Sequence, residues 1–490
     1  MNGIDLTAVA GALRAAGLLA GVRGELPESV SDVADDSRNI TQGGLFMAVR
    51  GTVLDGHEFL ADAAARGAAA AVVEDASVTE LPVFIVTDSR RAAAIVAAAA
   101  FGFPARMLRL VGVTGTNGKT TTVNILRHLL NEPDAVASSI GTLGVLIGSP
   151  GEPMPGGAGL TTPGPVELQR LFRALVDRGV RSVVMEVSSH SLHQRRVEGV
   201  AFAAAVFTNL TRDHLDYHET MQAYFAAKAE LVALVQPTGV MAVNADDAAW
   251  LALPHGPRTV TFGVRQPATV RATGVQYTPF GSDWTLEIDG ARAAVRLPLI
   301  GDFNVANAVG AAAAAWGMGL PLAELAVRLT NAPQVPGRLE VIGTKPTVLR
   351  DYAHTPDALE RALDAVRPFA RRRLLVVFGC GGDRDRGKRA PMGRIAAEHA
   401  DLAILTSDNP RTEDPERILD DVEAGMPPGK HERYVDRREA IARALELAEP
   451  DDVVLLAGKG HETYQVRGTT KYPFDEQEIV RELMTAGDRP

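Results

Sequence analysis

Short apolar runs alternate along the chain with longer segments in which apolar residues recur every three or four positions. The first pattern is typical of buried strands and the second of amphipathic helices. Strands that alternate with helices predict parallel sheets covered by helices, and hence the α/β class. The predicted strands include residues 69–73, 83–86, 107–113, 182–187, 203–207, 374–378, 402–406 and 453–457. The predicted helices include residues 5–20, 89–101, 123–130, 166–178, 221–235 and 358–367, and an alanine-rich helix that residues 299–308 open and that ends near Gly317.

Breaks in this pattern divide the chain into three predicted domains. Pro104–Arg109 and Val335–Arg338 have the composition of linkers, and 490 residues are too many for one hydrophobic core. The predicted domains are residues 1–106, 107–336 and 337–490. Within the second, a Gly/Pro-rich stretch at residues 148–164 predicts a loop.

Composition and charge exclude several classes of protein. Hydrophobic residues make up 46% of the chain and charged residues 22%, as in globular proteins, and the net charge of −10 argues against a nucleic-acid partner. Cys380 is the sole cysteine, so an internal disulfide and a cysteine-rich metal site are excluded. No signal peptide or membrane-spanning run is recognisable, which predicts a cytoplasmic protein without a membrane partner.

The stretch between the predicted strand 107–113 and the helix that follows is glycine-rich and ends in Lys-Thr-Thr. Backbone N–H groups in such a turn, together with the helix N-terminus, form a cradle for phosphate. Val113 stands where the common phosphate-loop pattern has glycine, so the match is to a more compact variant. We expect Lys119 to reach the β- and γ-phosphates of a nucleotide and the Thr120 hydroxyl to ligate Mg²⁺. The alternative is an ordinary strand-to-helix turn with a surface lysine.

Polar residues also follow the next two predicted strands. Glu186 ends an apolar run, where an isolated carboxylate is costly, so we expect it to ligate a metal ion rather than to form a structural ion pair. His214 lies in a polar cluster after the following strand and is a second candidate ligand. Lys228, in contrast, has the local sequence of a solvent-exposed helix lysine.

Two other local patterns leave alternatives open. Asn304 and Asn307 are three residues apart on a predicted helix, so they share a face and could serve a ligand, although one amide near a helix start is usually a cap. Ser37 with Arg38 could bind a polar ligand, but an N-cap followed by a surface arginine is the favoured interpretation.

In the third predicted domain, three strands each end in a charged loop. The carboxyl ends of neighbouring parallel strands share one edge of a sheet, so Arg384, Asn409, Arg411 and Glu462 should converge there. Arginine holds a carboxylate bidentately and a glutamate can hold an ammonium, so this combination suits a zwitterionic substrate. A surface ion network is the alternative.

Six motifs in this order resemble those of the Mur ligase family over nearly the whole chain. They are Thr-Gly-Thr-Asn-Gly-Lys-Thr-Thr, Glu-Val-Ser-Ser-His, Asn-Leu-x-x-Asp-His-Leu-Asp-x-His, Gly-x-Phe-Asn-x-x-Asn, Pro-Gly-Arg and Asp-Tyr-Ala-His-x-Pro. The resemblance implies ATP-dependent amide ligases of peptidoglycan precursor synthesis that act through an acyl phosphate. It also implies three domains: an N-terminal α/β domain for the UDP-sugar, a central P-loop-type ATPase domain with a parallel sheet, and a C-terminal Rossmann-like domain for the incoming amino acid.

Within the family, Asp-Ser-Arg and Gly-Lys-Gly-His-Glu resemble the enzymes that add the third peptide residue. The tetrad at 408–411 is similar to that of the forms that add meso-diaminopimelate to UDP-N-acetylmuramoyl-L-Ala-D-Glu. Lysine-adding relatives generally lack its arginine, which could hold the second carboxylate of diaminopimelate.

The resemblance also implies roles for individual residues. ATP would be bound by Gly115, Thr116, Asn117, Gly118, Lys119, Thr120, Thr121, Asn304, Asn307, Arg338 and Asp351. The UDP-muramoyl dipeptide would be bound by Ser37, Thr161, Thr162, Ser188, Gln194 and Arg196, and uracil by residues around Thr52–Leu54. Diaminopimelate would be bound by Arg384, Asp408, Asn409, Pro410, Arg411, Gly458 and Glu462. Lys119, Glu186, His214 and Lys228 would be catalytic; Thr120, Glu186, His214 and Lys228, the last as a carbamate, would hold Mg²⁺.

Three rival hypotheses remain at this stage. The same ligase could add L-lysine, or the chain could be a folylpolyglutamate-type ligase that shares the phosphate loop and the acyl-phosphate chemistry. A nucleotide-switch module that binds a partner protein is a rival from another class. The expected partners are small molecules, and the expected state is a monomer.

Overall fold

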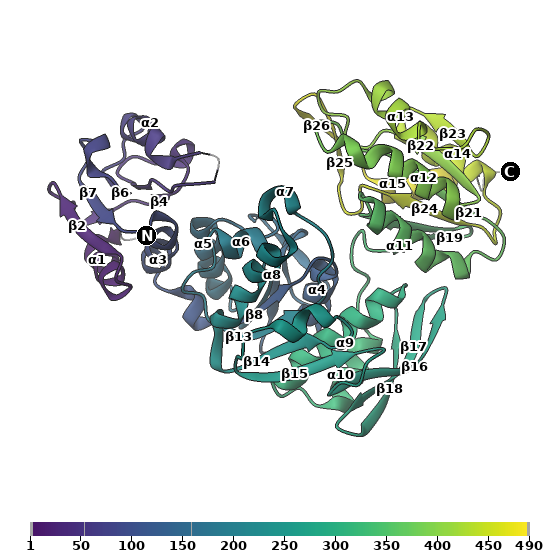
Figure 1. Ribbon diagram of the computed structural model, residues 1–490, viewed down its shortest axis with the longest axis horizontal. Coiled ribbons are helices and arrows are strands. Elements are labelled where there is room, and N and C mark those ends of the chain that lie inside the picture. Colours follow the sequence, from purple (N-terminus) through teal and green to yellow (C-terminus); the bar gives the residue numbers. More distant parts are fainter. Residues whose placement is uncertain (1–2, 53, 158, 488–490) are drawn as a thin grey trace. The chain divides into compact units, whose positions relative to one another are not determined.

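The computed structural model describes residues 3–52, 54–157 and 159–487. The density of internal contacts separates the chain into two compact units. Met1–Arg271, Leu286–Ala293 and Asn307–Arg328 form the first, and Ala272–Thr285, Ala294–Ala306 and Leu329–Pro490 form the second. Helices and strands alternate through most of both, which confirms the α/β class (Figure 1).

The first hundred residues form a five-stranded sheet in the order β2-β7-β6-β5-β4, in which only β2 runs antiparallel to its neighbour. Apolar residues of α1 and α3 pack on one face of this sheet, and those of α2 pack on the other. The elements are α1 (Leu6–Ala15), β2 (Leu19–Arg23), β4 (Val33–Ala34), β5 (Leu45–Met47), α2 (Leu60–Ala65), β6 (Ala70–Val73), β7 (Val83–Val86) and α3 (Ser89–Ala100), with β1 (Ile4–Asp5) paired to β3 (Ser29–Val30).

The helix expected over residues 5–20 is too long. Helix α1 ends at Ala15, and Gly17 adopts a left-handed conformation with φ of +67° that reverses the chain. Strand β2 then begins at Leu19. Glycine after a helix terminus is the usual stop signal, because only glycine takes that conformation without strain.

The central part of the chain forms an eleven-stranded sheet, with the strand order β11-β10-β9-β12-β8-β13-β14-β15-β16-β17-β18. Strands β9, β12, β8, β13, β14 and β15 are parallel neighbours, so the polar residues that follow β8, β12 and β13 lie at one edge. The strands are β8 (Arg109–Thr114), β9 (Ala137–Gly141), β10 (Gly144–Ile147), β11 (Glu152–Met154), β12 (Ser182–Glu186), β13 (Phe202–Phe207), β14 (Val235–Asn244), β15 (Arg258–Gly263), β16 (Val270–Thr278), β17 (Gly281–Ile288) and β18 (Ala291–Leu297).

Two further expectations for this region need correction. The stretch 148–164 is not all loop, because β11 pairs antiparallel with β10. The helix expected over 221–235 ends at Ala229; a short 3-10 turn follows, and strand β14 begins at Val235. The helices of this region are α4 (Lys119–Leu130), α5 (Pro165–Asp177), α6 (Ser189–His193), α7 (Leu215–His218), α8 (Met221–Ala229), α9 (Asp302–Gly317) and α10 (Leu322–Thr330).

The last third of the chain forms a six-stranded sheet in the order β19-β20-β24-β21-β22-β23. Alternate residues of its strands pack on α11, α12 and α13 on one face and on α14 and α15 on the other, as in a doubly wound fold (Figure 1). The elements are β19 (Glu340–Thr344), β20 (Thr347–Asp351), α11 (Pro356–Val366), β21 (Leu374–Phe378), α12 (Arg389–His399), β22 (Leu402–Thr406), α13 (Pro415–Glu423), β23 (His431–Tyr434), α14 (Arg437–Leu447), β24 (Val453–Ala457), β25 (Tyr464–Arg467), β26 (Thr470–Pro473) and α15 (Glu476–Gly487).

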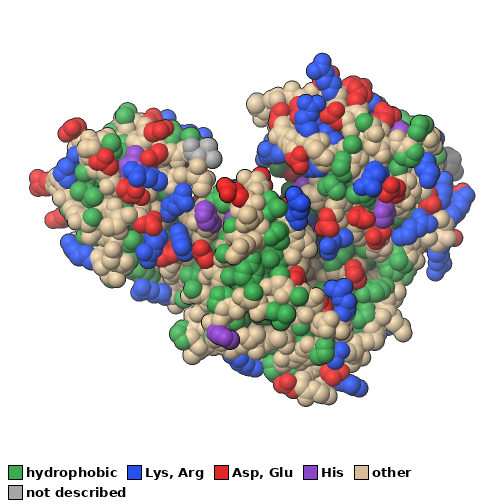
Figure 2. Space-filling model, viewed as in Figure 1, with side chains coloured by type: hydrophobic (Ala, Val, Ile, Leu, Met, Phe, Trp, Pro, Cys, Tyr) green, Lys and Arg blue, Asp and Glu red, His purple; other side chains and the backbone are tan. Residues whose placement is uncertain are grey.

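Acidic and basic side chains are interspersed over the face shown in Figure 2. No described helix is long and apolar enough to cross a membrane.

Candidate active site

The loop predicted to bind phosphate lies between β8 and α4, so the expected strand, turn and helix are present. Gly115 and Gly118 have φ values of +147° and +82°, and Gly118 is the left-handed N-cap of α4. The loop is braced from the end of β13: the Thr208 hydroxyl donates to the Asn117 carbonyl at 2.7 Å, and the Asn117 N–H donates to the Asn209 side chain at 2.9 Å. Its shape is therefore fixed by neighbouring strands and suits an anion at the helix N-terminus.

Two lysine side chains meet at this loop. The Lys119 Nζ donates to the Gly115 carbonyl at 2.9 Å and to the Thr116 carbonyl at 2.7 Å. The Lys228 Nζ donates to the same Gly115 carbonyl at 2.8 Å and lies 4.5 Å from the centre of the Tyr224 ring. The expectation that Lys228 is solvent-exposed is wrong, because its side chain is only 1% exposed. Burial, reinforced by the charge of Lys119, holds the pKa of Lys228 well below its usual range.

Glu186 lies at the end of β12, buried beside the start of α4. Its Oε1 accepts the Thr120 hydroxyl at 3.0 Å and the Thr142 N–H at 2.8 Å. A Cβ at Gly141 would lie 2.3 Å from the same oxygen, so the backbone of β9 approaches the carboxylate closely. The structure thus brings together Thr120 and Glu186, two hard oxygen donors of the kind that Mg²⁺ prefers.

His214 lies in a cluster of aromatic rings. Its ring centre lies 4.8 Å from that of His190 and 6.0 Å from that of Tyr224. Burial lowers the pKa of His190 to about 4 and also lowers the pKa of His214, which favours neutral imidazoles. Within the described residues, no group of three or more His, Cys, Asp or Glu side chains could hold a metal ion by itself. A metal ion here would take further ligands from the hydroxyl of Thr120 and from phosphate.

The two asparagines of α9 have different surroundings. Asn304 donates its amide to the Ile300 carbonyl at 2.7 Å, so this contact is not the cap expected of one amide near a helix start, in which a side-chain oxygen accepts from a backbone N–H. Asn307 lies against the phosphate loop, because a Cβ at Gly118 would come within 2.2 Å of the Asn307 Oδ1. Asn307 is therefore in close contact with the loop at Gly118.

Gly118→Ala is expected to raise the KM for ATP by about 10-fold or more, because the new methyl group would displace the Asn307 amide and strain the N-cap. Gly179→Ala is the matched control, because Gly179 has φ of +78° but nothing within 4 Å of an added Cβ. Both variants should lose about 1 kcal/mol of unfolding free energy from backbone strain. Steady-state kinetics and thermal unfolding measure the two effects. An unchanged KM for ATP in Gly118→Ala would contradict the assignment.

Four of the residues that the resemblance assigns to the muramoyl dipeptide lie together near β12 and α6. Thr162 donates its hydroxyl to the Glu186 carbonyl at 2.9 Å and accepts the Ser188 N–H at 3.1 Å. Arg196 donates to the Thr162 carbonyl at 2.8 Å and to the Gln194 side chain at 2.6 Å. Thr161 precedes Thr162 in the same loop. Burial lowers the pKa of Arg196, so an anion would find a desolvated partner in this cluster.

Ser37 lies in a short 3-10 turn between β4 and β5. The N-cap is Asp36, not Ser37, because the Asp36 carboxylate accepts the Arg38 N–H at 2.9 Å. The Ser37 side chain is buried, and its hydrogen bond lowers the pKa of the Asp62 carboxyl. Of the residues around Thr52–Leu54, Val53 lies outside the described residues.

Arg338 and Asp351 lie together at the start of the third sheet. The Asp351 carboxylate accepts the N–H groups of Leu339 at 2.7 Å and Ala353 at 2.8 Å, and burial raises its pKa against the opposing effect of Arg338. The Arg338 guanidinium lies 4.8 Å from the centre of the Tyr352 ring. Arg338 is thus placed between an aromatic face and a buried carboxylate.

At the carboxyl edge of the third sheet, the loops after β22 and β24 meet as the sequence predicts. Asn409 donates its Nδ2 to the Glu462 Oε2 at 2.9 Å. A Cβ at Gly458, where φ is +115°, would lie 2.6 Å from the Asp408 carboxylate, so only glycine fits there. Because β20, β24, β21 and β22 are parallel neighbours, their loops share this edge.

Arg411 is held by its neighbours in a left-handed conformation with φ of +52°. Its Nη1 donates to the Gly382 carbonyl at 2.8 Å, and its N–H donates to the Val466 carbonyl at 3.1 Å. A Cβ at Gly382 would lie 1.9 Å from the Pro410 carbonyl, so the tetrad packs tightly on the loop after β21. Arg384 lies exposed on that loop. The site therefore presents arginine, amide and carboxylate groups at one edge.

Sequence reasoning missed several residues that shape these sites. Thr208 and Asn209 brace the phosphate loop, and Lys459 contacts both Asn409 and Glu462 from a fully buried position. These residues could have been found from their positions, because all three follow the carboxyl ends of predicted strands, where ligand-binding residues lie in parallel sheets.

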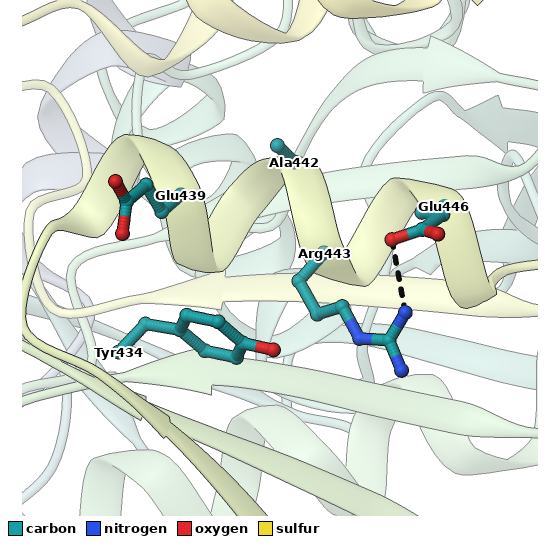
Figure 3. A pocket seen from close by; sticks show the side chains of 5 residues that line it. All are labelled: Tyr434, Glu439, Ala442, Arg443 and Glu446. Atoms are coloured by element: carbon teal, nitrogen blue, oxygen red, sulfur yellow. Dashed lines mark hydrogen bonds and ion pairs between the residues drawn. The ribbon is translucent and has the colours of Figure 1, made fainter.

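A separate hollow lies on α14 and β23, lined by Tyr434, Glu439, Ala442, Arg443 and Glu446 (Figure 3). The Arg443 guanidinium is ion-paired with Glu446 at 2.9 Å and with Glu432 at 2.9 Å. The charge of Arg443 is therefore balanced within the protein, and the strand-end loops remain the better candidates for chemistry.

A glycine-rich strand-to-helix loop on a parallel sheet, together with a polar cluster at the carboxyl edge of a doubly wound sheet, is the architecture of a nucleotide-dependent ligase. The chain belongs to the Mur ligase family. Its residues 113–315 match the Mur ligase middle domain, residues 337–460 the Mur ligase glutamate ligase domain, and residues 30–111 the Mur ligase family catalytic domain.

Individual relatives agree with this membership. The chain is 46% identical over 458 residues to UDP-N-acetylmuramoyl-L-alanyl-D-glutamate--2,6-diaminopimelate ligase of Geobacillus kaustophilus, covering 91% of this chain and 93% of the relative. A solved structure of a ligase of that name has a TM-score of 0.68 at 34% identity, covering 94% of this chain and 96% of the other. Folylpolyglutamate synthase of Mycobacterium tuberculosis, solved with ADP and AMPPCP, shares the fold with a TM-score of 0.62 at 20% identity over 76% of this chain and 92% of its own.

Proposed function

We propose that this chain is an ATP-dependent ligase that joins meso-diaminopimelate to the D-glutamate of UDP-N-acetylmuramoyl-L-Ala-D-Glu in peptidoglycan precursor synthesis. The carrying observation is the grouping of Asn409, Arg411 and Glu462 at one sheet edge, within a chain of the Mur ligase family. The identity of 46% to a ligase named for this reaction supports the same substrates. We place the reaction in the cytoplasm and expect a monomer.

In the proposed first step, the γ-carboxylate of the D-glutamate residue attacks the γ-phosphate of ATP, and ADP leaves. Gly115–Thr121 hold the phosphates through backbone N–H groups, and Lys119 swings from its carbonyl contacts to the transferring group. Its charge offsets the negative charge that develops on the phosphoryl oxygens. Asn304, Asn307, Arg338 and Asp351 complete the proposed nucleotide site.

The described residues suit a magnesium ion, which the family implies. Thr120 and Glu186 would hold it, and His214 and a carbamate on Lys228 would contribute further ligands. When bound, the ion would neutralise phosphate charge. The protein contributes the orientation of the Glu186 carboxylate, which the Thr120 and Thr142 donors fix before any ligand arrives.

Lys228 is the proposed site of carbamylation. Its lowered pKa favours the neutral amine, which alone attacks carbon dioxide, forming an N–C bond and releasing one proton. The product is an anion beside the phosphate loop, where the charge of Lys119 would stabilise it.

In the proposed second step, the amine of diaminopimelate attacks the acyl carbon, and phosphate leaves as the amide forms. Ser37, Thr161, Thr162, Ser188, Gln194 and Arg196 would hold the UDP-muramoyl dipeptide. Diaminopimelate would be held by Arg384, Asp408, Asn409, Pro410, Arg411, Gly458 and Glu462, with Arg411 on its distal carboxylate.

The proposed domains are residues 1–106 for the UDP-sugar, 107–336 for ATP and 337–490 for the amino acid.

The deciding experiment compares ADP release with UDP-N-acetylmuramoyl-L-Ala-D-Glu and either meso-diaminopimelate or L-lysine. We expect turnover with diaminopimelate alone, because lysine lacks the carboxylate that Arg411 would hold. Arg411→Ala should raise the KM for diaminopimelate by about 50-fold or more through loss of a charge-assisted contact. Turnover with lysine would keep the ligase and refute the role of Arg411. No turnover with either amino acid would refute the proposal in favour of a folylpolyglutamate-type ligase or a nucleotide switch.

A further inference from the structure

Lys459, in the loop after β24, is a fully buried lysine. Its side chain is 0% exposed, whereas lysine is almost never buried without a partner. The Nζ lies 3.2 Å from the Asn409 Oδ1 and 3.3 Å from the Glu462 Oε2, so it donates to both residues. Removing a cation from water costs free energy, so a buried lysine needs compensating contacts. Lys459 has these contacts with two residues of the proposed amino-acid site.

The contacts of Lys459 decide which way the Asn409 amide faces. The Asn409 Oδ1 accepts from Lys459 at 3.2 Å and from the Val466 N–H at 2.9 Å. An amide nitrogen cannot accept these two donors, so the oxygen must face them and the Nδ2 must face Glu462. One of the two Nδ2 hydrogens is used by Glu462, which leaves the other for a substrate acceptor.

The same lysine orients Glu462. Its Oε2 accepts from both Asn409 at 2.9 Å and Lys459 at 3.3 Å, and the side chain is 17% exposed. With one carboxylate oxygen held by two donors, the other oxygen is left for a substrate ammonium.

We propose that Lys459 is a positioning residue for amino-acid recognition, which fixes the Asn409 amide and the Glu462 carboxylate as one donor–acceptor pair for the zwitterionic end of the substrate. This inference rests on the proposed function and adds to it a residue that does not touch the substrate. It separates two tasks: Arg411 supplies charge to a carboxylate, whereas Lys459 sets the direction of the two groups beside it.

The test is Lys459→Met, which keeps the length of the side chain and removes its charge and its donors. We expect the KM for diaminopimelate to rise about 30-fold, with kcat at saturation within about 3-fold and the KM values for ATP and the UDP-dipeptide unchanged. Lys471→Met is the matched control, because Lys471 is an exposed lysine of the β25–β26 hairpin. That variant should behave as wild type.

Further variants keep the inference falsifiable. If Lys459→Met does not fold, Lys459→Gln fills a polar pocket but cannot reach both oxygens, and the same rise in KM is expected. In a double-mutant cycle, Glu462→Gln and Lys459→Met should be strongly non-additive, because each disrupts the same pair. An unchanged KM for diaminopimelate in a folded variant, or an equal loss for all three substrates, would overturn the inference. Wild-type enzyme that does not need diaminopimelate would instead refute the proposed function.

Discussion

Lys119→Ala is expected to abolish ADP formation, with kcat lower by about 1,000-fold or more. The Lys119 ammonium is within hydrogen-bond distance of two carbonyls of the phosphate loop, which places it where the γ-phosphate would enter. Without it, nothing from α4 carries positive charge to the transferring phosphoryl group. Release of ADP in the presence of both other substrates is the measurement.

Two controls separate chemistry from folding in this experiment. Lys119→Met keeps the aliphatic chain and should be as inactive as the alanine variant, because the ammonium is what matters. Binding of the UDP-dipeptide by titration calorimetry should persist in both, since its proposed site lies around Thr162 and Arg196. An active Lys119→Ala enzyme would refute the assignment of the loop to phosphate transfer.

Lys228→Met is expected to lower kcat by about 100-fold or more, because the proposed carbamate can no longer form beside the phosphate loop. The wild-type enzyme should lose activity when bicarbonate and carbon dioxide are removed and regain it when they return. The methionine variant should be insensitive to both treatments. Lys345→Met is the control, because Lys345 is an exposed lysine in the turn between β19 and β20. This variant should respond as wild type.

The pH dependence of the unfolding free energy is an independent test of the lowered pKa of Lys228. The pKa of Lys228 is held well below its ordinary value of 10.5, so between the two values the unfolded chain binds a proton that the folded protein does not. The unfolding free energy should therefore rise with pH in this interval, and Lys228→Met should remove that part of the rise. A variant that loses activity and keeps this slope would contradict the buried position of the amine. Full activity without carbon dioxide would contradict the carbamate.

The sequence alone determined the parts of this protein whose chemistry is local. The phosphate loop needs a strand, two glycines in special conformations and a helix start, and all of these lie within 107–130. Strand ends followed by polar residues likewise located Glu186, Asn409 and Glu462, because parallel strands bring their carboxyl ends to one edge whatever their order in the sheet. The order of the six motifs along the chain likewise identified the Mur ligase family without any structure.

Only the tertiary structure decided what surrounds each polar group. Lys228 lies on α8, whose alanine-rich sequence has no distinct polar face, so its burial depends on a contact with Gly115, 113 residues away. Lys459 pairs with Asn409 across 50 residues, and its neighbours in sequence are glycines that reveal nothing about burial. The direction of a pKa shift and the orientation of an amide are set by groups that meet through folding. Periodicity and spacing describe one segment at a time and hold no information about which segments meet.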